Sequence, residues 1–110
     1  MNWIPLSDES QLPEIIDKST ERPQVIFKHS TRCSVSSMAK NRLEKISVLP
    51  NMDFYYLDLI KYRKLSNRIA NDFKIRHESP QVIVIKNKIP VYNESHSGII
   101  MDEIIESVKE

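Results

Sequence analysis

The sequence predicts one α/β domain, spanning residues 1–110, with a central mixed sheet of about four strands and helices on both of its faces. Apolar residues alternate between helical spacing and short β-type runs along the chain. The elements follow the order α, β, α, β, α, β, β, α. The first β-α-β unit predicts parallel, right-handed pairing of two strands, and the two consecutive later strands predict a hairpin.

The first helix and strand are predicted from a change of hydrophobic period. Residues 10–19 carry apolar side chains on one helical face, with Ser10 as the N-cap, and Pro23 stops the helix. Residues 24–28 are β-branched and aromatic, which is typical of a buried strand. A short further strand is expected near residues 3–5. The apolar positions of this helix are Leu12, Ile15 and Ile16.

The second helix is predicted from Ser34 to about Val48, with Pro50 just beyond its end. A second apolar strand follows over residues 52–57. The apolar positions of this helix are Val35, Met38, Ala39, Leu43 and Ile46.

The second half of the chain adds two helices and a hairpin. Residues 81–86 form the clearest strand, Asn87-Lys88 is a candidate two-residue turn, and residues 89–93 pair back. The last helix is expected to begin near Gly98. The third helix is marked by Tyr62, Leu65, Ile69 and Phe73, and the last by Met101, Ile104, Ile105 and Val108. The aromatic residues expected in the core are Trp3, Phe27, Phe54 and Phe73.

The composition argues against several classes of function. A net charge of +1 is low for a nucleic-acid binder, and no apolar run is long enough to span a membrane. The single glycine excludes Gly-rich phosphate loops. The first residues lack the basic and apolar regions of a signal peptide, and a lone cysteine cannot form an internal disulfide, so we expect a cytoplasmic location. Neither the cysteine nor the three histidines has the spacing of a metal site, and we expect no metal.

The candidate reactive residue is Cys33, the only cysteine, which lies between a strand and a helix. A helix N-terminus favours a thiolate, and the positive charge of Arg32 acts in the same direction. We therefore expect the pKa of this thiol to lie in the upper part of the range of about 3.5–7.5 found for reactive cysteines. Three positions later, where a dithiol oxidoreductase has its second cysteine, the chain has Ser36. The sequence predicts a redox site with one thiol.

Three segments carry a resemblance to a known family. They are Lys-His-Ser-Thr-Arg-Cys-Ser-Val-Ser-Ser at 28–37, Glu-Ser-Pro-Gln at 78–81 and Ser-His-Ser at 95–97. Together they resemble the YtxJ family of monothiol bacilliredoxins, also called bacilliredoxin C, over nearly the whole chain. The resemblance implies a thioredoxin-like fold in which the Ser79–Pro80 bond is cis and lies against the cysteine.

Members of that family are cytoplasmic bacterial proteins thought to remove bacillithiol from mixed disulfides on other proteins. The resemblance implies that Cys33 is the nucleophile, with no bound cofactor and with bacillithiol as a co-substrate. The expected partners are S-bacillithiolated proteins and a low-molecular-weight thiol, not nucleic acid or a membrane. Some members have proline directly after the cysteine, where this chain has Ser34. The residues expected around a bound thiol are Arg32, Ser34, Ser36, Ser79, Pro80 and His77, and candidate partners for the bacillithiol carboxylates are Arg32, Lys28, Arg76 and His77.

Two other functions stay open on the sequence. The chain could be a non-catalytic interaction module whose cysteine is a regulatory thiol. It could also be a monothiol glutaredoxin-like iron–sulfur protein, although such proteins typically have Gly-Phe after the cysteine and a Gly-Gly pair before the last helix. Here the residues are Ser34-Val35 and a lone Gly98. Lys28 is expected to be structural or on the surface, and His29, His77 and His96 to be hydrogen-bonding groups on the surface or in loops.

Overall fold

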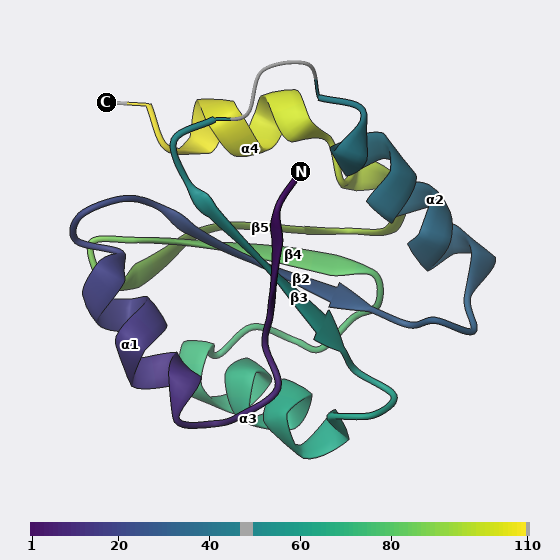
Figure 1. The fold of residues 1–110 in the computed structure, drawn as a ribbon, viewed down its shortest axis with the longest axis horizontal. Helices are drawn as coiled ribbons and strands as arrows, with labels where there is room; N and C mark the ends of the chain where they lie inside the picture. The colour runs from purple at the N-terminus through teal and green to yellow at the C-terminus, as the bar shows by residue number, and fades with distance from the viewer. Residues whose placement is uncertain (47–49, 110) are drawn as a thin grey trace.

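The computed structural model describes residues 1–46 and 50–109 (Figure 1). The elements alternate between strands and helices, as the sequence predicts. In chain order they are β1 (Trp3–Pro5), α1 (Gln11–Lys18), β2 (Gln24–His29), α2 (Ser34–Glu44), β3 (Asp53–Asp58), α3 (Arg63–Phe73), β4 (Gln81–Lys86), β5 (Ile89–Ser95), the 3₁₀ helix η1 (His96–Gly98) and α4 (Met101–Ser107). No helix in these two described stretches is long and apolar enough to cross a membrane.

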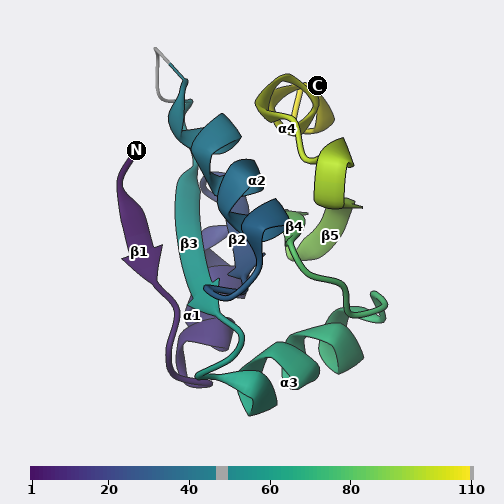
Figure 2. The ribbon, with the colours of Figure 1, turned by 90° about the vertical axis from the view of Figure 1, so that its right-hand side faces the viewer.

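The strands form one mixed sheet in the order β1-β3-β2-β4-β5, which Figure 2 shows from one edge to the other. Strands β1 and β2 both run parallel to β3, whereas β4 is antiparallel to β2 and to β5. The parallel β-α-β unit and the hairpin are thus confirmed. The sheet has five strands instead of about four, because the short strand expected near residues 3–5 pairs with β3 at the edge.

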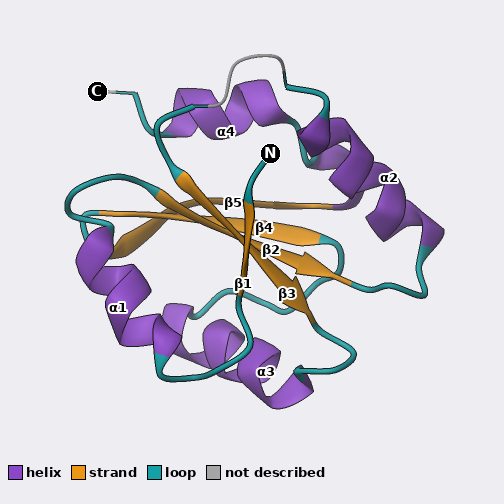
Figure 3. Cartoon of the chain, in the orientation of Figure 1, coloured by secondary structure: helices purple, strands orange, loops and turns teal. Residues whose placement is uncertain are grey.

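Helices cover both faces of the sheet, with α2 and α4 on one side and α1 and α3 on the other (Figures 1 and 3). Each face has its own hydrophobic cluster, and neighbouring residues of β2 alternate between them. Phe27 belongs to the cluster under α2 and α4, and Ile26 to the cluster under α1 and α3. Full burial of one such side chain contributes about 1.5–3 kcal/mol. The expected core residues Trp3 and Phe73 are only partly buried at the margins of these clusters.

The face that α2 turns to the sheet agrees with the predicted one at Ala39 and Leu43 and differs from it in the first turns. Ser36, Ala39 and Leu43 are buried, whereas Val35 and Met38 are 42% and 61% exposed. The buried positions are spaced by three and four residues, so they share one helical face and leave the other two on its flank. The helix ends at Glu44, and its predicted end near Val48 lies outside the described residues.

The observed boundaries of the last strand and the last helix also differ from the predicted ones. Strand β5 continues to Ser95, two residues beyond the prediction. The helix expected from Gly98 begins at Met101, because His96–Gly98 form a 3₁₀ turn and Ile100 is extended. In the first helix the predicted N-cap position of Ser10 is confirmed, although its side chain makes no capping hydrogen bond.

The β4–β5 turn forms without a glycine. Asn87 and Lys88 both have positive φ, 52° and 71°, as a two-residue hairpin turn requires. Both backbone N–H groups donate to Ser19: the first to its carbonyl at 3.0 Å and the second to its hydroxyl at 2.9 Å. These bonds from the end of α1 compensate for a left-handed conformation that lysine does not favour.

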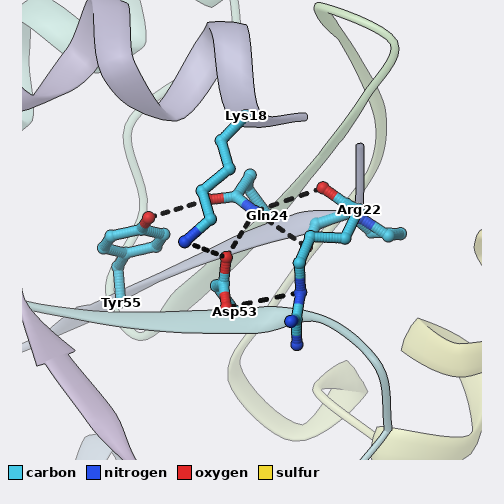
Figure 4. A network of polar contacts seen from close by, with 6 residues as sticks. Lys18, Arg22, Gln24, Asp53 and Tyr55 are labelled. Carbon is cyan, nitrogen blue, oxygen red and sulfur yellow. Dashed lines mark hydrogen bonds and ion pairs between the residues drawn. The ribbon is translucent and has the colours of Figure 1, made fainter. Parts of the chain in front are cut away.

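A polar network connects α1, β2 and β3 at the N-terminal ends of the two strands (Figure 4). The Tyr55 hydroxyl donates to Gln24 Oε1 at 2.7 Å, and Gln24 Nε2 donates to Asp53 Oδ2 at 2.8 Å. Lys18 and Arg22 form ion pairs with the same carboxylate, at 3.1 and 3.4 Å. Burial alone would raise the pKa of Asp53, but these donors and cations outweigh it, so the pKa lies below its ordinary value.

Replacing Asp53 with alanine should lower the free energy of unfolding at neutral pH by about 1–3 kcal/mol, because the variant loses hydrogen bonds to a charged group. The native carboxylate stabilises the fold above its unfolded pKa of about 3.9, and this contribution disappears as the pH falls through the lower folded pKa. Urea unfolding of both proteins at neutral and acidic pH should therefore show a gap that narrows in acid.

The matched control is Asp17→Ala, which removes a more exposed carboxylate lying 3.9 Å from Lys88. This substitution should change stability by less than about 0.5 kcal/mol. An equal loss in the two variants, or a gap for Asp53→Ala that stays constant in acid, would contradict the account of the network.

Candidate functional site

Cys33 lies at the junction of β2 and α2, as the sequence predicts. It occupies the N-cap position of α2 with extended backbone, and it is partly exposed. Its N–H donates to the Ser30 carbonyl at 3.1 Å, and its carbonyl accepts from Ser37 N at 3.1 Å. The thiol therefore stands at the electropositive end of a helix, outside the hydrophobic clusters.

A buried histidine and a buried serine lie beneath the turn that carries this cysteine. His29, the last residue of β2, is almost fully buried, which corrects the expectation of a group on the surface or in a loop. Its Nδ1 lies 2.7 Å from the Ser36 hydroxyl, which also accepts from Ser30 N at 3.0 Å. The predicted contact between Ser36 and a small thiol stays a prediction, and the structure adds these contacts within the protein.

The surroundings of His29 favour its neutral form. Its ring packs against Phe27 and Tyr56, with centroids 5.7 and 5.3 Å away. Burial lowers its pKa below the ordinary value, and the positive charge of Lys40 adds to the shift. Asp58, a hydrogen bond with the Ser36 backbone, and Glu44 act in the opposite direction without reversing it. A neutral imidazole with its proton on Nε2 can accept a hydrogen bond from the Ser36 hydroxyl at Nδ1.

The loop before β4 reaches the same end of the sheet. The Ser79–Pro80 bond is cis, as the resemblance implied. The next residue, Gln81, is paired with Lys28 near the C-terminal end of β2, so Pro80 lies beside the strand end from which the cysteine turn departs. Pro80 is buried, while Ser79 is partly exposed.

Arg42 connects the cysteine helix to this loop and was not predicted from the sequence. Its Nη2 donates to the His96 carbonyl at 3.0 Å and its Nε to the Ile99 carbonyl at 3.3 Å. The N–H of His96 in turn donates to the Pro80 carbonyl at 3.0 Å. His96 itself is exposed, as expected. A contact across 54 positions has no local signal in the sequence.

Lys28 is fully buried, so of the two expected places, structural or on the surface, it has the structural one. It neighbours Phe27 in β2 and therefore faces the other side of the sheet from α2. Its Nζ donates to the Ser66 carbonyl at 3.1 Å and lies 3.3 Å from His77 Nδ1. Burial lowers the pKa of this amine to about 8. An amine enclosed there does not reach a carboxylate bound beside Cys33.

The other expected thiol-binding residues divide into two places. Arg32 and Ser34 are exposed directly beside Cys33. His77 is partly buried in the loop before Pro80, and burial together with the charge of Lys28 lowers its pKa. Arg76 is exposed on that loop. Contacts of these four side chains with a small thiol stay predictions.

The buried amine makes stability depend on alkaline pH. The folded pKa of Lys28, about 8, lies below its ordinary value of 10.5, so the unfolded chain binds more protons between these values and folding becomes more favourable as the pH rises. Lys28→Met should abolish this rise, which amounts to at most about 3 kcal/mol. Urea unfolding across this range, compared as the difference between the two proteins, cancels the titration of the tyrosines.

The exposed lysine Lys64 on α3 provides the control, since Lys64→Met should leave the pH dependence unchanged. If the free energies of unfolding of the native protein and Lys28→Met changed with pH in parallel, the folded protein would not lower the pKa of this amine. That result would contradict the burial argument.

Comparison with known proteins agrees with this geometry. The family model of the monothiol bacilliredoxin BrxC matches residues 4–104. A protein of thioredoxin fold, assigned provisionally to the oxidoreductases, is 30% identical with a TM-score of 0.85, and the match covers 96% of this chain and 93% of that one.

Two thioredoxins show the fold alone, because their sequences are more distant. Thioredoxin O2 from Arabidopsis thaliana, in its oxidized state, has a TM-score of 0.74 at 14% identity. The match covers 98% of this chain and 95% of that thioredoxin. The Malassezia sympodialis thioredoxin Mala s 13 has a TM-score of 0.72 at 20% identity, with 96% and 88% covered. With the family match over residues 4–104, the chain belongs to the BrxC family of monothiol bacilliredoxins, which are oxidoreductases of thioredoxin fold.

Proposed function

We propose that the protein removes bacillithiol from mixed disulfides on other proteins, with Cys33 as the nucleophile. The observation that carries the proposal is the placement of the only thiol, partly exposed at the N-terminus of α2 and on the same end of the sheet as the Pro80 loop. A cytoplasmic, reducing compartment would suit a chain with one free thiol.

The proposed exchange needs one thiol and no bound cofactor. The Cys33 thiolate attacks the bacillithiol sulfur of a protein mixed disulfide, the S–S bond of the substrate breaks, and the substrate cysteine leaves as a thiolate that takes a proton from water. A new disulfide now joins bacillithiol to Cys33. A second low-molecular-weight thiol then attacks this bond, releases the small disulfide and restores the Cys33 thiolate. Over the cycle the substrate cysteine is reduced and the incoming thiol is oxidised, while the bacillithiol sulfur enters and leaves in a disulfide.

The surface around Cys33 supports binding of both halves of such a substrate. Arg32, beside the cysteine, is a cation within reach of an anionic small thiol, since bacillithiol carries the carboxylates of a malate group. After the cysteine in the chain, Val35 and Met38 on the first turns of α2 are 42% and 61% exposed. Exposed apolar side chains of this kind suit contact with a polypeptide.

The central experiment mixes the reduced protein with a bacillithiolated model protein and follows both by intact mass. The bacillithiol mass should move from the substrate to this chain, and Cys33→Ser should abolish the transfer, because a hydroxyl does not attack a disulfide. An unchanged substrate in the presence of native protein would instead support a non-catalytic module with a regulatory thiol.

The charge of Arg32 should affect the rate of this transfer. Arg32→Glu should slow it by about twofold to fivefold at low salt, the size of one exposed ion pair, and the difference should shrink as salt rises. Lys64→Glu makes the same change of charge on the opposite side of the sheet and should leave the rate unchanged. Equal slowing in both variants would mean that only the net charge matters.

A further inference from the structure

We propose that His29 and Ser36 act together as positioning residues for Cys33, holding its turn in the reactive conformation through a hydroxyl–imidazole hydrogen bond. This inference deepens the proposed function, on which it rests. It concerns the reactivity of the thiol itself, so it can be tested without bacillithiol.

A continuous chain of hydrogen bonds leads from the histidine to the cysteine backbone. The Ser36 hydroxyl lies 2.7 Å from His29 Nδ1, and the same oxygen accepts from Ser30 N at 3.0 Å. The carbonyl of Ser30 accepts from Cys33 N at 3.1 Å. Ser30 is thereby fixed to the buried pair, and the Cys33 N–H is bonded to Ser30.

The donors and acceptors of this chain are matched only while His29 is neutral. With the ring proton on Nε2, Ser36 donates its one hydroxyl proton to Nδ1, while an oxygen lone pair receives the Ser30 N–H. If the imidazole takes a proton, Nδ1 becomes a donor, and the Ser36 hydroxyl proton loses its acceptor in a buried place.

Charged and titratable groups around His29 come from the helix and the strand packed against it. Lys40 and Glu44 belong to α2, and Asp58 and Tyr56 belong to β3. Burial and Lys40 favour the neutral imidazole, and the two carboxylates oppose them. The arrangement therefore keeps the acceptor form that the Ser36 hydroxyl requires.

The role assigned to Ser36 explains what this position does in a protein with one thiol. The residue stands where a dithiol oxidoreductase has its second cysteine, yet its side chain is fully buried and bonded to His29. Ser36 therefore positions the turn of the nucleophile, and a second low-molecular-weight thiol releases bacillithiol from Cys33.

The test measures the alkylation rate of Cys33 by iodoacetamide, at a pH where the thiol of each variant is fully ionised. Ser36→Ala and His29→Leu should each slow alkylation by about threefold to tenfold, the effect of one buried hydrogen bond. The double variant should be no slower than either single variant, because the two residues act through one bond. His29→Asn, whose amide oxygen can take the place of Nδ1, should recover most of the rate.

Tyr55→Phe is the matched control for stability. It also removes a buried 2.7 Å hydrogen bond, but at the other end of β2 from Cys33. It should lower Tm about as much as Ser36→Ala does and leave the alkylation rate unchanged. All rates are measured well below the Tm of each variant. If Ser36→Ala does not fold, Ser36→Thr and His29→Leu are compared instead. Ser36→Thr keeps the hydroxyl and should keep the native alkylation rate, whereas His29→Leu should lose it.

The proposal is overturned if Ser36→Ala and His29→Leu lower Tm but change alkylation by less than about twofold, because the pair is then merely structural. Additive slowing in the double variant overturns it as well. A failure of bacillithiol transfer in the native protein would refute the proposed substrate, while the alkylation rates would still decide whether His29 and Ser36 position the thiol.

Discussion

The pairing of β2 on both of its edges determines where the thiol lies. Every residue of this strand is buried, and the strand is hydrogen-bonded to β3 on one side and β4 on the other. The chain leaves the sheet at the C-terminal end of β2, turns, and enters α2 at Cys33. The antiparallel register of β4 brings Pro80 to the same end, so two segments far apart in sequence meet there.

Polar residues within this buried strand serve three separate purposes. Gln24 joins the network at the N-terminal end, Lys28 contacts α3 and the loop of His77, and His29 contacts Ser36 under the cysteine turn. Each has partners inside the protein, as a buried polar group requires. Near its C-terminal end the strand is thus hydrogen-bonded to α3 on one face, through Lys28, and to α2 on the other, through His29.

Much of the fold follows from the sequence, because hydrophobic periodicity is a local signal. The alternation of helices and strands, the hairpin and the position of Cys33 at the start of α2 were all predicted. The burial of His29 was not, since the predicted strand ended at Lys28. The partners of Lys28 and His29 were not predicted either, because they lie 38, 49 and 7 positions away. Val35 and Met38 were predicted to be buried because they are apolar, but they are exposed, since the helix faces the sheet through Ser36 and Ala39.

The polar network of Figure 4 lies at the opposite end of β2 from the thiol. Replacements around Tyr55 and Asp53 are therefore distant from the reactive turn, and the effects of well-separated sites tend to add. Substitutions at the N-terminal end of β2 can therefore raise or lower thermal stability without altering the reactivity of the thiol at the other end. A lineage, or an engineer, could raise heat resistance first and retune thiol selectivity afterwards.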